Sequence, residues 1–230
     1  MSIAIVRLAR RSVPRHEAGM EQDVASGRVW GARTAIQRRD SRRGALIRAA
    51  IVVYGAIGYR QATVKAVCEQ AGLTERYFYE SFANSEDLLQ ACFLHVTRDL
   101  LARMRAASAA AEPTGLDRVR AGLRVYFTAL REHPAAARVF LIELASVSPA
   151  TEALVSASLD EFGALLLDVL QPGPNAIVSP LLLRGVVGGG LHIAQAWISS
   201  AYAASTEEAV ETALRLYAIV GGSERRPSCV

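Results

Sequence analysis

The chain has 230 residues, of which 51% are hydrophobic and 21% are charged. This composition is sufficient for a buried core and excludes a chain that is disordered throughout. The three cysteines are scattered and have no histidine at ligand spacing, so we predict neither a disulfide framework nor a zinc site. Residues 3–6 are the only apolar run near the N-terminus, which is too short for a signal peptide. We therefore expect a cytoplasmic protein that needs no metal and no cofactor.

The excess of positive charge lies at the N-terminus. Residues 1–43 contain ten arginines and four acidic residues, so this segment carries +6 while the rest of the chain carries −2. Such an arm attracts phosphate without sequence specificity. A solvated tail, or a true start at Met20, explains the same charge equally well. Because residues 1–40 show no sustained periodicity and contain a proline and three glycines, we predict a mostly disordered arm.

From residue 41 onwards, apolar residues recur at the three- and four-residue spacing of helices, and no strand pattern competes. Capping and breaking residues divide this part of the chain into separate helices. The expected helices span residues 41–57, 64–71, 75–82, 85–107, 116–132, 135–147, 150–170, 179–204 and 206–220. The prediction is an all-α chain of about nine helices. Residues 41–88 form a compact first domain, residues 89–221 a longer helical domain, and residues 222–230 a flexible tail.

Two short helices joined by the turn at Gly72 have the arrangement of a helix-turn-helix, whose second helix enters the major groove of DNA. Thr63 is the expected N-cap of the first helix and the hydroxyl of Thr74 that of the second. Asn84 or Ser85 is expected to cap the long helix that follows.

The second short helix carries three consecutive aromatic residues with different expected roles. Phe78, together with Phe82 four residues later, is expected to face the core. Arg76 is the best candidate for a bidentate contact with guanine, because side chains in the first turns reach base edges. The hydroxyl of Tyr79 can contact a phosphate oxygen. Packing of Tyr77 and Tyr79 against the first helix is the alternative.

Three segments between residues 41 and 89 form a recognisable pattern: LIRAA, VY and GYRQATVKAVCEQAGLTERYFYESFANSEDLL. They resemble the first helix, Gly-Tyr turn, helix-turn-helix and acidic-Leu start of helix four of the TetR family of bacterial transcriptional regulators. The resemblance implies a homodimer that binds a palindromic operator, most often as a repressor, and a C-terminal helical domain that holds a small ligand. Ser85 departs from the lysine that often opens helix four, and arginines 38, 39, 42 and 43 are expected to replace its phosphate contact.

The residue types and the resemblance together give a set of expected DNA contacts. Phosphates are expected to meet Thr63, Tyr79 and Ser81, and the groove is expected to meet Lys65, Glu75, Arg76 and Tyr77. The full set of expected DNA-binding residues is Arg42, Arg43, Thr63, Lys65, Thr74, Glu75, Arg76, Tyr77, Tyr79 and Ser81.

The resemblance also places the dimer interface on the last two helices, residues 179–204 and 206–220. Small residues there allow close helix approach, and a glycine-rich helix with no packing partner would fray, since each glycine costs roughly 1 kcal/mol relative to alanine. An ordinary buried helix within one subunit is the alternative. A membrane span is disfavoured because Arg184, His192 and Gln195 interrupt the apolar stretch.

The helices of residues 89–221 enclose an apolar interior with few polar groups, which favours a lipophilic ligand. The candidate ligand-binding residues are His95, Tyr126, Phe127, Phe140, Glu143, Phe162 and Trp197.

Other functions are less well supported by the sequence. An enzyme is not expected, because no nucleophile, phosphate-loop or zinc-protease motif occurs and the four histidines are scattered. Thiol sensing by Cys68 or Cys92 is disfavoured, since both face inward and nothing basic is placed to lower their pKa. A helical adaptor, or an architectural DNA-binding dimer without a ligand, remains the alternative to a ligand-responsive regulator.

Overall fold

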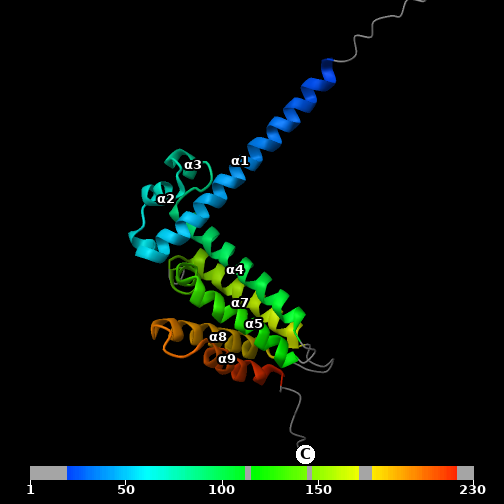
Figure 1. Ribbon diagram of the computed structural model, residues 1–230, viewed down its shortest axis with the longest axis vertical. Helices are drawn as coiled ribbons and strands as arrows, with labels where there is room; N and C mark the ends of the chain where they lie inside the picture. Colours follow the sequence, from blue (N-terminus) through cyan, green and yellow to red (C-terminus); the bar gives the residue numbers. More distant parts are fainter. Residues whose placement is uncertain (1–19, 112–114, 144–146, 171–177, 222–230) are drawn as a thin grey trace, which may run out of the picture. The chain divides into compact units, whose positions relative to one another are not determined.

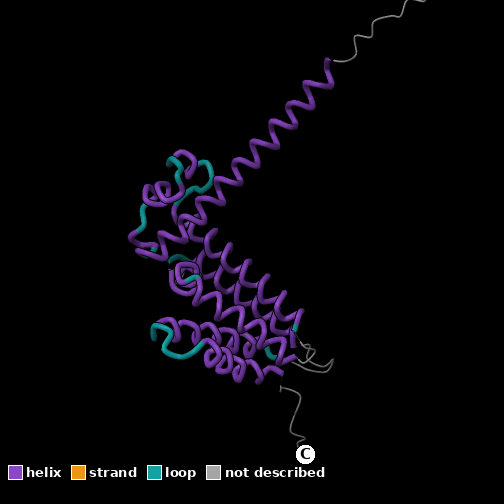
Figure 2. Tube along the Cα trace, viewed as in Figure 1, coloured by secondary structure: helices purple, strands orange, loops and turns teal. Residues whose placement is uncertain are grey.

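The computed structural model describes residues 20–111, 115–143, 147–170 and 178–221, with side chains from residue 34 onwards. The predicted tail and the first part of the predicted arm lie outside the described residues. Within the described ranges every regular element is helical and there is no strand (Figure 2). The all-α class is therefore confirmed.

The elements follow the expected order, with boundaries set by local capping. The bounds are α1 Met20–Ile57, the 3₁₀-helix η1 Tyr59–Gln61, α2 Val64–Ala71, α3 Glu75–Tyr79, α4 Ser85–Ala110, α5 Gly115–Glu132, α6 Pro134–Arg138, the π-helix η2 Val139–Glu143, α7 Pro149–Leu170, α8 Pro180–Ser199 and α9 Thr206–Gly221. The described residues thus contain nine α-helices, as the sequence predicted.

The first helix is longer than expected. α1 begins at Met20, so residues 20–40, which were expected to be mostly disordered, are helical. Gly27 and Gly31 are the main helix-weakening residues there, and each costs only about 1 kcal/mol relative to alanine. This part of α1 has no buried side chain in its described portion, since residues 34–41 are all exposed. This part of α1 belongs to a structural unit that ends at Ser41. The rest of α1 and the described helices after it belong to a second unit, which begins at Arg42.

Capping explains the tight turns between α1 and α4. The Thr63 hydroxyl oxygen accepts a hydrogen bond from the Ala66 amide at 3.1 Å, as predicted. Gly72 ends α2 in the left-handed conformation, with a φ of 66° that glycine adopts without steric cost. Asn84 caps α4 by accepting from the Asp87 amide at 2.9 Å. The prediction for Thr74 was wrong in one respect: its side chain makes no capping bond, although its backbone stands at the N-cap position.

Aromatic burial fixes α3 in place. Phe78 is fully buried and Phe82 is 4% exposed, and both join Leu46 and Tyr54 of α1 in the core. Burying such side chains contributes about 1.5–3 kcal/mol each. The regular helix ends at Tyr79 rather than at Phe82, and the chain continues in a turn in which the Phe82 amide donates to the Phe78 carbonyl at 2.8 Å.

The C-terminal helices form a layered bundle. α4, α5 and α7 lie side by side, and the α8–α9 pair packs against α5 and α7 (Figure 1). The predicted domain boundary after residue 88 falls inside α4, so one continuous helix serves both the helix-turn-helix and the bundle. The predicted helix 135–147 is divided in its described part into α6 and the π-helix η2.

Candidate nucleic-acid interface and ligand pocket

α3 presents one exposed flank and one buried flank. The Arg76 side chain is 84% exposed and Tyr79 is 60% exposed, whereas Phe78 between them is fully buried. The helix produces this separation, because Arg76 and Tyr79, three residues apart, share one face while Phe78 points to another. The exposed flank therefore carries a guanidinium and a phenol hydroxyl, both of which can donate hydrogen bonds to nucleic acid.

Two arginines of α1 contact α3 and the turn that follows it. The Arg42 guanidinium lies 4.4 Å from the centroid of the half-buried Tyr77 ring and 3.8 Å from the Glu80 carboxylate. The Arg43 guanidinium donates to the Ser81 carbonyl at 2.6 Å and lies 4.2 Å from the centroid of the Phe82 ring. Both residues were expected to contact DNA. The structure shows that they contact α3 and the turn after it, and this contact orients the helix.

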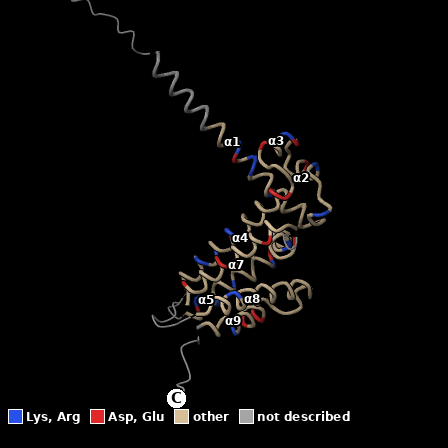
Figure 3. The backbone as a smooth tube through the Cα atoms, turned by 180° about the vertical axis from the view of Figure 1, so that it is seen from behind, with Lys and Arg blue, Asp and Glu red and all other residues tan. Residues whose placement is uncertain are grey.

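Arg76 has a partner of its own. Its Nε lies 3.0 Å from a Glu80 carboxylate oxygen, one turn further along the helix. An exposed pair of this spacing contributes only about 0.3–0.5 kcal/mol, so a base edge can replace the glutamate at little cost. Figure 3 shows the same mixture of acidic and basic residues along α2 and α3. The carboxylates reduce non-specific attraction to phosphate on this face.

The remaining predicted DNA residues are placed on α2 and on the start of α3. Thr63 is exposed, and although its oxygen accepts the capping bond, its hydroxyl hydrogen is still able to reach a phosphate. Lys65 forms an exposed pair with Glu69 at 3.9 Å. Thr74 and Glu75 are also exposed, and Ser81 is half-buried.

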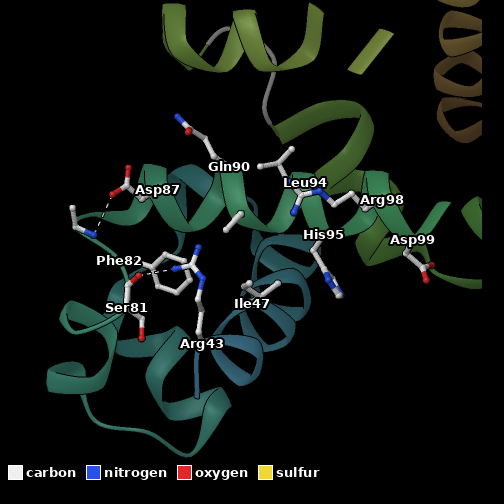
Figure 4. Close-up of a pocket in the computed structure, with 12 residues that line it drawn as sticks. Arg43, Ile47, Ser81, Phe82, Asp87, Gln90, Leu94, His95, Arg98 and Asp99 are labelled. Atoms are coloured by element: carbon white, nitrogen blue, oxygen red, sulfur yellow. Dashed lines mark hydrogen bonds between the residues drawn. The ribbon is translucent and has the colours of Figure 1, made fainter. Parts of the chain in front are cut away.

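A polar groove lies between α1 and α4. It has a volume of about 720 Å³, and Arg43 and Ile47 of α1 face Leu94 and His95 of α4 across it (Figure 4). The interior position expected for His95 was wrong, because its side chain is exposed in this groove. The helix that carries His95 was predicted correctly but the face was not, since α4 has apolar residues on more than one side.

The aromatic residues of the bundle do come together. Tyr126 of α5, Phe140 of η2 and Phe162 of α7 have ring centroids between 5.9 and 6.5 Å apart. Two adjoining cavities of about 40 and 20 Å³ lie beside this cluster. Phe162 lines both cavities and Tyr126 lines the smaller one.

Phe127 and Trp197 lie outside these cavities and pack against each other. Phe127 is fully buried with its ring centroid 5.4 Å from that of Trp197. The indole nitrogen of Trp197 donates to the Ala204 carbonyl at 2.8 Å, which fixes the loop between α8 and α9. Neither residue lines the two cavities.

Glu143, expected in the ligand pocket, instead connects the bundle to the helix-turn-helix. Its carboxylate accepts from the Tyr59 amide at 2.8 Å and pairs with Arg138. A second connection joins the Ser148 hydroxyl to the carboxylate of Glu86 near the start of α4. Local sequence patterns did not indicate these bonds, because their partners lie far apart along the chain. Glu143 shares η2 with Phe140, so this π-helix contacts both the aromatic cluster and η1, which follows α1.

The α8–α9 pair leaves apolar side chains in solvent. Leu181 is 82% exposed, Ile219 is 53% exposed, and a Cβ at Gly185 or Gly188 would meet nothing within 4 Å. Gly190 differs, since a Cβ there would overlap the Tyr217 hydroxyl of α9. Among the described helices, α8 alone is long and apolar enough to cross a membrane, a weak indication because helices of soluble proteins pass the same test.

The fold and the exposed flank of α3 define a helix-turn-helix DNA-binding domain joined to a helical bundle. Comparison with known proteins agrees with this assignment. Residues 46–92 match the family of bacterial regulatory proteins, tetR family. No curated protein sequence matched the chain. Residues 46–92 are therefore similar to the DNA-binding domain of this family, and this domain lies at the N-terminal end of the bundle.

Solved structures share the fold over most of the chain. The fatty acid degradation regulator FadR from Bacillus halodurans is 20% identical with a TM-score of 0.68, over 80% of this chain and 97% of that one. FadR from Bacillus subtilis in complex with stearoyl-CoA is 20% identical with a TM-score of 0.66, over 75% and 96%. A TetR family transcription regulator from Marinobacter aquaeolei VT8 is 21% identical with a TM-score of 0.62, over 80% and 97%.

Proposed function

We propose that this protein is a ligand-responsive transcriptional repressor that binds a palindromic operator as a homodimer. Residues 41–88 form its DNA-binding domain and residues 89–221 its ligand-binding and dimerisation domain. It acts in the cytoplasm, where a small lipophilic ligand releases it from DNA. The observation that carries the proposal is the exposed flank of α3, where Arg76 and Tyr79 project from a helix that is fixed by its buried Phe78.

Dimerisation supplies the symmetry that a palindromic operator requires. The exposed leucines and the open glycines of α8, together with Ile219 of α9, supply apolar surface of the kind that a second copy can cover. Two copies would present two α3 helices to half-sites about 34 Å apart along the duplex. A ligand acts by favouring a separation of these helices that no longer fits the DNA.

The route from pocket to DNA runs through contacts on both sides of η2. A ligand near Phe140 can shift η2, and Glu143 on the same short helix holds the Tyr59 amide at the start of η1, directly after α1. α1 in turn positions α3 through Arg42 and Arg43. This chain of contacts supports the proposal that ligand binding changes the orientation of the recognition helix.

Selection of bound sequences from random duplexes by the purified protein tests the DNA-binding part. We expect an inverted repeat. Arg76→Ala should then lose discrimination at one base pair of each half-site, with a cost of about 1–3 kcal/mol at that position. The matched control is Arg103→Ala on α4, which should leave selection unchanged. Indifference of the wild type to every duplex at low ionic strength would remove the regulator proposal.

An architectural DNA-binding dimer without a ligand is the second candidate. The small size of the two interior cavities, about 40 and 20 Å³, favours it. It predicts the same inverted repeat but no compound that lowers operator affinity. A helical adaptor would instead be indifferent to Arg76→Ala.

A further inference from the structure

The interior of the bundle contains an unused hydrogen-bonding group. The hydroxyls of Thr97 and Tyr126 are buried without a hydrogen-bond partner within the described residues. Tyr126 is 6% exposed and lines the smaller cavity, whereas Thr97 lines neither of the two. A buried hydroxyl without a partner is unfavourable, so this position is prepared for a group that can hydrogen-bond with it.

Apart from Tyr126, the only polar side chains among the described residues that line the two cavities are the hydroxyl-bearing Ser108 and Tyr217. The side chains that line the two cavities are mostly Leu, Val, Met and Phe, and none of these described lining residues is charged. The Ser108 hydroxyl already donates to the Arg118 carbonyl at 2.9 Å. Burial raises the pKa of Tyr126 well above its ordinary value, so its hydroxyl stays protonated and is able to donate.

The residues that line the two cavities determine whether a ligand bound there can be charged. A carboxylate in these cavities would be buried with no cation among the lining residues, which is strongly unfavourable. A carbonyl or hydroxyl group is far less costly to bury, and the phenol hydroxyl compensates it with one hydrogen bond. The wall therefore selects a neutral molecule.

The cavities can enlarge at flexible side chains. Met104 of α4 lines both, and an unbranched thioether side chain adapts its shape readily. Phe162 is only partly buried and can move as well. Met104 belongs to α4, the helix that follows α3 and connects it to the bundle. A ligand that displaces Met104 therefore also acts on the helix next to the helix-turn-helix.

We propose that these cavities bind a neutral, mostly apolar molecule whose single carbonyl or hydroxyl group hydrogen-bonds with Tyr126, and that they reject a carboxylate of the same chain length. The inference rests on the proposed function, since it names the chemical class of the ligand and the residue that anchors it.

Isothermal titration of the full chain with methyl octyl ketone and with decanoate tests this inference. The two probes have the same number of carbons, and at about pH 7.5 only decanoate is charged. We expect the ketone to bind the wild type at least about tenfold more tightly than decanoate. Tyr126→Phe should weaken ketone binding about fivefold, the loss of one neutral hydrogen bond, and leave decanoate unchanged.

Tyr202→Phe is the matched control, because the Tyr202 hydroxyl donates to the Leu130 carbonyl at 3.3 Å and lines neither cavity. It should leave ketone affinity unchanged. Thermal melting verifies folding, and Tyr126→Phe should melt no lower than the wild type, since the lost hydroxyl had no partner. Equal affinity for the two probes, no binding of the ketone, or unchanged ketone affinity in Tyr126→Phe would each overturn the inference.

Operator binding by the same samples without any probe keeps the two proposals apart. If an inverted repeat is bound while the ketone result fails, only the ligand class proposed here is wrong. If no duplex is bound, the proposed function fails, and the titration still decides what the cavities bind.

Discussion

At the level of single residues, α3 separates its structural and its exposed side chains by position alone. Phe78 is fully buried, while its neighbour Tyr79 is 60% exposed and touches Phe78 only through an edge contact, with ring centroids 5.1 Å apart. The two aromatics therefore differ in what their removal costs. Phe78 determines whether α3 stays in place, and Tyr79 is available to bind a partner.

Truncation of the two aromatics tests this division. Phe78→Ala should lower the free energy of unfolding by about 3–5 kcal/mol, because it leaves a cavity in the core between α1 and α3. Tyr79→Ala should change it by no more than about 0.5 kcal/mol. Urea unfolding followed by circular dichroism measures both. Similar losses for the two variants would show that the Tyr79 ring also belongs to the core.

Cys92 illustrates how burial controls a titratable residue. It is fully buried on α4, and this burial raises the pKa of its thiol from an ordinary 9.0 to about 12, against a smaller opposite effect of Arg43. The native thiol therefore stays protonated and unreactive at neutral pH. This agrees with the sequence-based expectation that Cys92 faces inward.

The raised pKa predicts a loss of stability in alkali. Above pH 9 the unfolded thiol ionises while the folded one does not, so this contribution to stability is complete below pH 9 and is lost as the pH rises toward 12. Cys92→Ala should reduce this alkaline loss. Denaturant unfolding between pH 8 and about pH 10.5 gives the slope. Fast alkylation of Cys92 in the folded protein at pH 8 would contradict this prediction, because a buried and protonated thiol should react slowly.

At the level of elements, the end of α1 lies very close to α6 of the bundle. A Cβ at Gly55 would overlap both the side chain and the backbone of Ala135 on α6. Beside this contact, Gly58 has a φ of 81° and the Tyr59 amide binds Glu143. The helix-turn-helix is thus joined to α6 and η2 at one compact junction.

A matched pair of glycine substitutions on α1 tests this junction. Gly55→Ala should lower the free energy of unfolding by about 1–3 kcal/mol, because backbone atoms must move apart. Gly44→Ala should raise it by up to about 1 kcal/mol, since alanine favours the helix. The added Cβ at Gly44 would meet only the end of the flexible Arg48 side chain, at 3.3 Å. Chemical denaturation compares the two, and a gain from Gly55→Ala would show that α6 packs less closely than described.

At the level of the whole molecule, the charged side chains of the helix-turn-helix and the most exposed leucine of the described bundle lie on different elements. The acidic and basic residues of the side proposed to face DNA are on α2 and α3, while Leu181, the most exposed leucine of the described residues, is on α8. Within the bundle, Arg124 of α5 pairs with Glu207 of α9 at 2.8 Å, and Arg184 of α8 pairs with Asp160 of α7 at 2.7 Å. These two exposed pairs join α9 to α5 and α8 to α7.

Leu181→Glu tests the proposed dimer. A carboxylate placed in an apolar interface is costly to bury, so the variant should sediment as a monomer where the wild type sediments as a dimer. Operator affinity should fall with it, because two linked half-site contacts become separate binding events. Leu116→Glu on α5, where the leucine is 41% exposed, is the control and should stay dimeric. An unchanged sedimentation coefficient for Leu181→Glu would place the interface elsewhere.

The sequence by itself determined the features that depend on near neighbours. The helix class, the Thr63 and Asn84 caps, the turn at Gly72 and the inward Phe78 all follow from residues within one or two turns of each other. The tertiary structure decided the rest. It turned His95 outward, used Arg43 to hold Ser81, and brought Glu143 to Tyr59, 84 residues away. Such contacts depend on how whole helices pack, and local periodicity carries no information about which distant face each helix will meet.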